Sequence, residues 1–122
     1  MITKVFHSFL FAWRGLLTVW NEEHNFRIEI VVALLVIFSI FYFQFSFIEA
    51  VLCIIAMTIV LSAEIINTVI EDLCNKVEPH HDQIIAKIKD TSGAFVLVSV
   101  LGAIIVGLLV FYHHFFPDSF TA

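Results

Sequence analysis

The sequence is short of charged residues, and this scarcity excludes an ordinary soluble domain. Of its 122 residues, 14% are charged and 61% are hydrophobic. Average soluble domains contain about 25% charged and about 45–50% apolar residues. A soluble fold of this size could not bury so much apolar surface, whereas a lipid bilayer can cover it. We therefore expect an integral membrane protein.

Basic residues and cysteines are also few. Six Lys and Arg residues stand against eleven Asp and Glu residues, which leaves no basic patch and argues against a nucleic-acid partner. Cys53 and Cys74 fall within one predicted helix and cannot reach each other, so we expect free thiols. A cleavable signal-peptide pattern is not evident, and the first membrane span is expected to direct insertion.

Long stretches without charge predict the membrane helices, since about 20 apolar residues cross a bilayer. The predicted spans cover about residues 28–47, 49–71 and 92–116. Apolar residues at helical spacing over residues 2–20 predict an amphipathic helix on the membrane surface, although a core helix would give the same pattern. The charged segment 72–90 is expected to be a polar loop with some helix. The predicted fold is an all-α membrane protein, one domain over residues 1–122.

The basic residues predict the orientation of these helices. All six lie in two segments, before the first span and between the second and third, namely Lys4, Arg14 and Arg27, then Lys76, Lys87 and Lys89. Because basic residues are enriched on the cytoplasmic side of membrane proteins, we expect both segments in the cytoplasm. The N-terminus is therefore predicted to be cytoplasmic.

One face of the second span is polar where a membrane helix is normally apolar. Glu64, Asn67, Glu71 and Asn75 are spaced so that they share one side of a helix. A carboxylate within a span costs roughly 2.5–3.5 kcal/mol at the helix centre, so it indicates a function by default. The deeper Glu64 suits a general base for a hydroxyl at the lipid boundary, and the shallower Glu71 suits a divalent cation.

Charged residues at the same predicted depth precede the other two spans. Glu22, Glu23 and Glu29 lie before the first span, and Lys89 and Asp90 lie before the third. They offer carboxylates for a cation and positive charge for a phosphate. Two alternatives stay open. Glu64 could form only an interhelical hydrogen bond, or a non-enzymatic oligomer such as a small channel or transporter could use the polar face as an ion path.

Three motifs resemble one known family. The first is Trp-Arg-Gly at residues 13–15 with Asn-Glu-Glu at 21–23 and Asn-Phe-Arg-Ile-Glu at 25–29. The second and most specific is Glu-Ile-Ile-Asn-Thr-Val-Ile-Glu at 64–71, and the third is Lys-Asp-Thr-Ser-Gly-Ala at 89–94. In motif order, spacing and predicted topology, nearly the whole chain resembles the bacterial integral-membrane diacylglycerol kinases, which include the undecaprenol kinases.

The resemblance implies a lipid kinase that uses ATP and Mg²⁺, in the bacterial cytoplasmic membrane. It further implies a homotrimeric helical bundle with active sites between subunits, and phosphatidic acid as the product from diacylglycerol. By position, Glu64 corresponds to the general base, and Glu23 and Glu71 to metal ligands. Nucleotide-binding positions correspond to Lys4, Phe11, Glu23, Glu71, His80, His81, Asp82, Lys89 and Asp90. Lipid-binding positions correspond to Glu64, Asn67, Arg27, Glu29 and Gly93.

Two positions depart from the family pattern. Asn75 stands where the family commonly has Asp, and Lys4 where it usually has Arg, so a carboxylate and a bidentate guanidinium are replaced. Neither change removes the base or a metal ligand, so we expect activity with altered nucleotide affinity. The sequence does not distinguish diacylglycerol from undecaprenol as substrate. His113 and His114 are expected to lie at the non-cytoplasmic interface, away from the chemistry.

Overall fold

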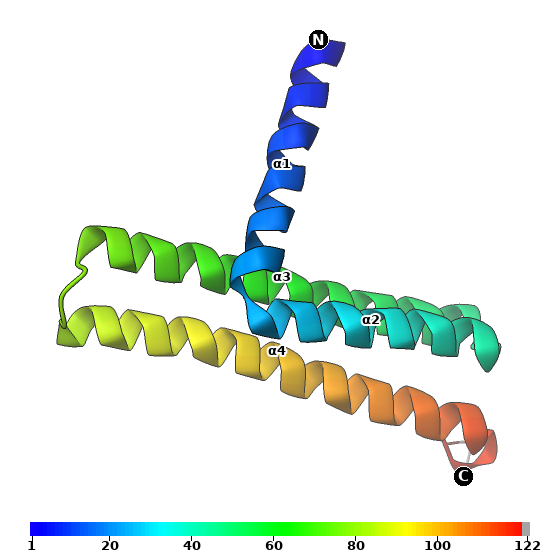
Figure 1. The fold of residues 1–122 in the computed structure, drawn as a ribbon. Coiled ribbons are helices and arrows are strands. Elements are labelled where there is room, and N and C mark those ends of the chain that lie inside the picture. The colour runs from blue at the N-terminus through cyan, green and yellow to red at the C-terminus, as the bar shows by residue number, and fades with distance from the viewer. Residues whose placement is uncertain (121–122) are drawn as a thin grey trace.

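Every regular element of the protein is helical in the computed structural model, which describes residues 1–120 (Figure 1). The elements in chain order are α1 (Ile2–Glu22), α2 (His24–Tyr42), α3 (Phe47–Val77), α4 (Gln83–Phe115) and the 3-10 helix η1 (Pro117–Phe120). Helices α3 and α4 form the main packed pair, and α2 packs on α3. Helix α1 projects from this bundle at a steep angle.

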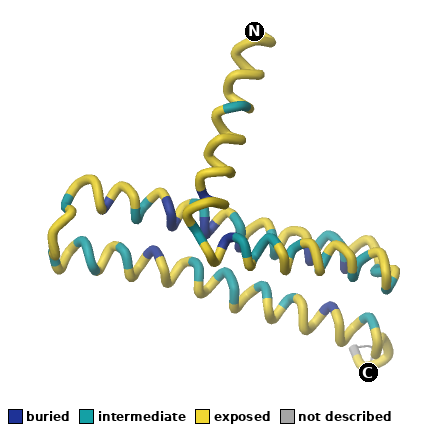
Figure 2. The backbone as a smooth tube through the Cα atoms, viewed as in Figure 1, coloured by how far each residue is buried: buried dark blue, intermediate teal, exposed yellow. Residues whose placement is uncertain are grey.

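Helices α2, α3 and α4 are each long and apolar enough to cross a membrane, which confirms the prediction of three spans. Their apolar side chains are mostly exposed on the single chain (Figure 2), as expected where lipid takes the place of a protein core. The buried positions gather along α3, where Val60 and Ala63 are almost fully covered. Cys53 and Cys74 are also buried there, and both are free thiols, as predicted.

The connection between α3 and α4 is shorter than the polar loop predicted over residues 72–90. Helix α3 has 31 residues and α4 has 33, and residues 78–82 alone separate them. At about 1.5 Å per residue, each is about 46–50 Å long, against about 30 Å for the hydrocarbon core of a bilayer. Lys and Glu are good helix formers, so a helix that contains them can continue beyond the bilayer into water.

Short local features end each helix and set its direction. Glu23 has extended backbone angles between α1 and α2, so a single residue lets α1 turn away. Ser46 and Glu49 form a reciprocal capping box at the start of α3. Gln44, with a φ of 54°, provides the left-handed turn before it. At the start of α4, an oxygen of Asp82 accepts hydrogen bonds from the N–H groups of Ile84 (2.9 Å) and Ile85 (3.0 Å).

Candidate active site

Glu64 lies on the face of α3 that meets the other helices. Its side chain is almost fully covered, with 2% of the residue exposed, and Asn67 and Thr68 beside it are also buried. The Thr68 hydroxyl donates a 3.0 Å hydrogen bond to the Glu64 carbonyl oxygen. The predicted polar face therefore exists and points inward at Glu64. Polar groups buried this way in a membrane helix are costly and mark functional positions.

A hydrogen bond between α3 and α4 fixes the position of Asn67. The Ser92 hydroxyl donates to the Asn67 side-chain oxygen across 2.7 Å, and both residues are buried. The bond lies less than one helical turn along α3 from Glu64. It holds the two longest helices in register where the buried carboxylate lies.

Four glutamates from three places in the chain surround this point, and we call them the acidic cluster. Glu23 comes from the α1–α2 corner, Glu29 from α2, and Glu64 and Glu71 from α3. Glu23, Glu29 and Glu71 are each close enough to repel the charge of Glu64. One oxygen of Glu29 is buried with no hydrogen-bond partner. An unpaired buried oxygen is unfavourable, so the acidic cluster is suited to take up a cation or a proton.

The donor atoms of the acidic cluster fit a hard divalent cation. Carboxylate oxygens are the ligands that Mg²⁺ and Ca²⁺ prefer. Within residues 1–120, no three His, Cys, Asp or Glu side chains are placed to hold a metal ion by themselves. Mg²⁺ commonly binds through one or two protein carboxylates together with phosphate oxygens and water. The cluster therefore fits an ion that arrives with a nucleotide better than a resident one.

A polar groove lies at the end of the bundle where α3 passes into α4. It brings together five of the predicted nucleotide-binding residues, and its lining consists of Asn75, Glu78, Pro79, His80, His81, Asp82, Ile85, Ala86, Lys89 and Asp90. The Lys89 ammonium donates a hydrogen bond to the Asn75 side-chain oxygen. Asp82 caps α4, and His80 contacts Glu78 at 3.1 Å. Lys89 is therefore the residue that gives this groove a permanent positive charge.

Lys4 and Phe11, two further predicted nucleotide-binding residues, are not brought to the polar groove by the single chain. Both are exposed on α1, which rises from the middle of the bundle, away from the α3–α4 connection (Figure 1). The Phe11 ring lies 5.7 Å from the guanidinium carbon of Arg14, a neighbour on the same helix. The prediction for these two residues depends on a second subunit.

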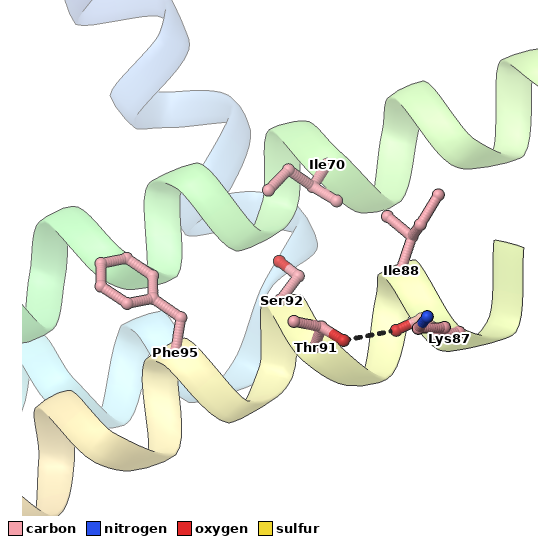
Figure 3. Close-up of a pocket in the computed structure, with 6 residues that line it drawn as sticks. All are labelled: Ile70, Lys87, Ile88, Thr91, Ser92 and Phe95. Atoms are coloured by element: carbon pink, nitrogen blue, oxygen red, sulfur yellow. Dashed lines mark hydrogen bonds between the residues drawn. The ribbon is translucent and has the colours of Figure 1, made fainter. Parts of the chain in front are cut away.

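An apolar groove runs between α3 and α4 next to the Asn67–Ser92 pair (Figure 3). Ile70 lines it from α3, and α4 contributes the rest of the lining, namely Lys87, Ile88, Thr91, Ser92 and Phe95. Ile88 and Ser92 point from α4 toward α3, which carries Ile70 (Figure 3). Gly93 is exposed beside Ser92, and a methyl group added to it would meet no atom within 4 Å. The half-buried Arg27 lies on α2 near Glu29.

The sequence interpretation missed Ser92 and the partner of Lys89. Ser92 is part of the third motif, but no separate role is predicted for this small residue. A lone hydroxyl within an apolar span is the signal that could have identified it, because such groups hydrogen-bond across helices. Asn75, which stands where the family commonly has Asp, therefore contacts the predicted nucleotide-binding residue Lys89 directly.

Comparison with known proteins places these observations in a family. The family model described as prokaryotic diacylglycerol kinase matches residues 10–111. The chain is 27% identical to the diacylglycerol kinase of Escherichia coli over 113 residues, 93% of either chain. It is 28% identical to the undecaprenol kinase of Bacillus subtilis over 110 residues, 90% of this chain and 89% of that one. The family model covers the acidic cluster, α2, α3 and most of α4, and the chain belongs to the prokaryotic diacylglycerol kinase family.

Proposed function

We propose that the protein transfers the γ-phosphoryl group of ATP to diacylglycerol, giving phosphatidic acid at the cytoplasmic face of the bacterial inner membrane. Lipid kinase activity follows from the family. Diacylglycerol is the acceptor in the name of the Escherichia coli relative. The observation that carries the proposal is the carboxylate of Glu64, 2% exposed in a helix that can span a membrane.

In this mechanism Glu64 accepts the proton of the lipid hydroxyl as the hydroxyl oxygen attacks the γ-phosphorus, and the bond from that phosphorus to the β–γ bridging oxygen breaks to release ADP. Phosphoryl transfer depends mainly on positioning and on neutralising charge. Asn67, held by Ser92, orients the polar face beside the base. Glu23 and Glu71 are the residues that would hold Mg²⁺, and the ion would supply positive charge to the phosphate oxygens. Lys89 adds a second positive charge from the polar groove.

The two grooves offer separate sites for the lipid and the nucleotide. The apolar groove meets the Glu64 face through Ser92, so an acyl chain held there would leave its hydroxyl near the base. Arg27, Glu29, Asn67 and Gly93 complete the proposed lipid site. The polar groove, with His80, His81, Asp82, Lys89 and Asp90, is the proposed nucleotide site. Lys4 and Phe11 would reach it from the α1 of another subunit of a homotrimer.

The proposed orientation has the N-terminus and the α3–α4 connection in the cytoplasm. Two of the six Lys and Arg residues lie on α1, and the other four lie near the ends of the candidate spans that would face that side. Helix α1 then lies across the span direction (Figure 1), as a helix on the membrane surface would. ATP and Mg²⁺ are available on that side.

Undecaprenol is the alternative acceptor, because the Bacillus subtilis relative carries that name at a similar identity. The purified protein would be given radiolabelled ATP, Mg²⁺ and either lipid in detergent micelles, with EDTA and heat-treated protein as controls. We expect labelled phosphatidic acid, at a higher rate than labelled undecaprenyl phosphate. A higher rate on undecaprenol would reverse the substrate assignment. No labelled lipid from either acceptor would favour a non-enzymatic channel or transporter.

A further inference from the structure

A second buried carboxylate lies at the end of the bundle remote from Glu64. Glu49, in the first turn of α3, is 6% exposed. His113 and His114 reach it from the last turn of α4. The Nδ1 atom of His113 lies 2.9 Å from Oε1 of Glu49, and that of His114 lies 3.0 Å from Oε2. Each oxygen of one carboxylate therefore contacts its own imidazole.

The Glu49 carboxylate joins three segments of the chain. Ionised carboxylate oxygens only accept hydrogen bonds, so both imidazoles must donate N–H to Glu49. The backbone N–H of Ser46 donates to Oε2 as well, at 2.8 Å, through the capping box. The α2–α3 turn, the start of α3 and the end of α4 thus meet at one side chain. His113 and His114 do more than occupy a membrane interface.

Aromatic rings surround one side of this contact while the other side stays accessible. The His114 ring lies 4.8 Å from that of Phe45 and 5.1 Å from that of Phe115, between ring centres. The His113 side chain is 53% exposed, against 21% for His114 and 7% for Glu49. Protons can therefore reach the pair through His113, although Glu49 itself is covered.

Few other ionisable groups lie at this end of the described chain. Cys53 lies one turn along α3 and is close enough to interact with the charge of Glu49. Tyr112 on α4, Asp118 on η1 and Tyr42 at the end of α2 complete the set, and residues 30–48 carry no Asp, Glu, Lys or Arg. The two imidazoles are thus the potential cations nearest Glu49.

We propose that Glu49, His113 and His114 form a proton-sensitive latch that ties the start of α3 to the end of α4. Histidine ordinarily changes charge between pH 5 and 8. Protonation of an imidazole adds the attraction between opposite charges to its hydrogen bond with the ionised Glu49 carboxylate. The latch is strongest where the imidazoles and Glu49 are all charged, weakens where the imidazoles lose their protons, and is lost where Glu49 becomes protonated. The proposed orientation places it outside the cytoplasm.

The test compares thermal unfolding of the full chain in detergent with EDTA, at pH 5.5 and pH 8.5. His113→Gln/His114→Gln removes both imidazoles, and Glu49→Gln removes the charge while keeping an oxygen for the Ser46 N–H. At pH 5.5 we expect the wild-type midpoint to exceed that of the histidine variant by about 4 °C or more. At pH 8.5 we expect less than half of that difference. Combining all three substitutions should add little to either variant.

His7→Gln, at an exposed histidine of α1, is the matched control and should retain the wild-type pH dependence. An equal pH dependence in the wild type and the histidine variant would overturn the latch. A difference that does not change with pH would also overturn it. If Glu49→Gln does not assemble, the histidine variant decides alone, because its substitutions lie at partly exposed positions. None of these outcomes depends on kinase activity, which is measured separately.

Discussion

Glu49 and Glu64 are both buried acids of α3, yet their surroundings give them opposite properties. Glu49 receives two imidazoles and a backbone N–H at 2.8–3.0 Å. Glu64 instead lies among other carboxylates, which repel its charge. Hydrogen-bond donors stabilise an ionised carboxylate, whereas like charges favour a proton on it. The first environment suits a structural contact, and the second suits a group that takes up a proton during a reaction.

Glu64→Gln should lower the turnover number by about 100-fold or more, because an amide cannot accept the hydroxyl proton. Its size is nearly unchanged, so the variant should purify with native thermal stability. Asp72→Asn removes an exposed charge from the same helix and serves as the control, with near-native turnover expected. Initial rates at saturating ATP and lipid measure both. A near-native rate for Glu64→Gln would show that another group is the base.

Lys89→Met should raise the KM for ATP by about 10-fold, because the polar groove loses its permanent positive charge. One lost charge-assisted contact, at about 1.5–3 kcal/mol, corresponds to a change of this size or larger. Lys76→Met removes an exposed lysine from the last turn of α3 and should leave KM unchanged. Rates over a range of ATP concentrations at fixed Mg²⁺ distinguish the two. Similar KM values in both variants would show that the nucleotide does not bind at Lys89.

At the scale of the helices, α3 and α4 are joined by side-chain pairs spread along their length. Ser92 binds Asn67 near the acidic cluster, Lys89 binds Asn75 at one end, and both histidines bind Glu49 at the other. Apolar contacts alone would let two helices slide past each other in lipid. The polar pairs define one register, because an unpaired polar group is costly there.

The Asn67–Ser92 hydrogen bond can be measured by a double-mutant cycle with Asn67→Ala, Ser92→Ala and the combined variant. Hydrogen bonds between membrane helices contribute about 0.6 kcal/mol on average and about 1.7 kcal/mol at most. We expect a coupling of this size in the free energy of unfolding by SDS in mixed micelles. The pair Asn67→Ala and Ser99→Ala serves as control, since Ser99 bonds within α4. Additive losses for Asn67 and Ser92 would mean that the contact stabilises nothing.

The sequence is enough to predict the helices and one polar face, but not the contacts between helices. Apolar runs located three spans, and spacing placed Glu64 and Asn67 on a common face. The charged residues at 72–90 predict a loop, but α3 and α4 extend into this segment because water-exposed helices carry charge freely. The pairs Asn67–Ser92 and Glu49–His113 join residues 25 and 64 positions apart. Periodicity identifies a face of a helix and not its partner on another helix.

On the scale of the whole molecule, much apolar surface has no partner within one chain. Phe6 and Phe9 on α1 are 60% and 65% exposed, and large apolar residues are exposed on α2 and α4 as well. Lipid can cover the spans, but α1 carries predicted nucleotide-binding residues that lie away from the polar groove (Figure 1). A homotrimer with shared sites would cover part of this apolar surface, and it would bring α1 of one subunit to the polar groove of another.

Mixing two inactive variants tests for shared sites. Lys4→Met and Glu64→Gln should each have low activity as uniform oligomers. If Lys4 serves a site whose Glu64 comes from another subunit, mixed oligomers contain some intact sites, and co-expression should raise the rate several-fold above either parent. Mixing the separately purified proteins without subunit exchange is the control and should give only the average rate. No gain on co-expression would place Lys4 and Glu64 in the same subunit's site.

The continuous helix α3 also sets the depth of the Glu64 carboxylate in the bilayer. From the cap at Ser46 to Glu64, an unbroken helix at about 1.5 Å per residue covers about 27 Å, close to the thickness of the hydrocarbon core of a bilayer. With the α2–α3 turn at one membrane surface, the carboxylate lies at the level where hydrocarbon meets headgroups on the other. In the proposed lipid kinase, an acceptor would then be selected by the level at which it presents a hydroxyl rather than by its hydrocarbon chain. Such selection would accommodate lipids as different as diacylglycerol and undecaprenol on one scaffold.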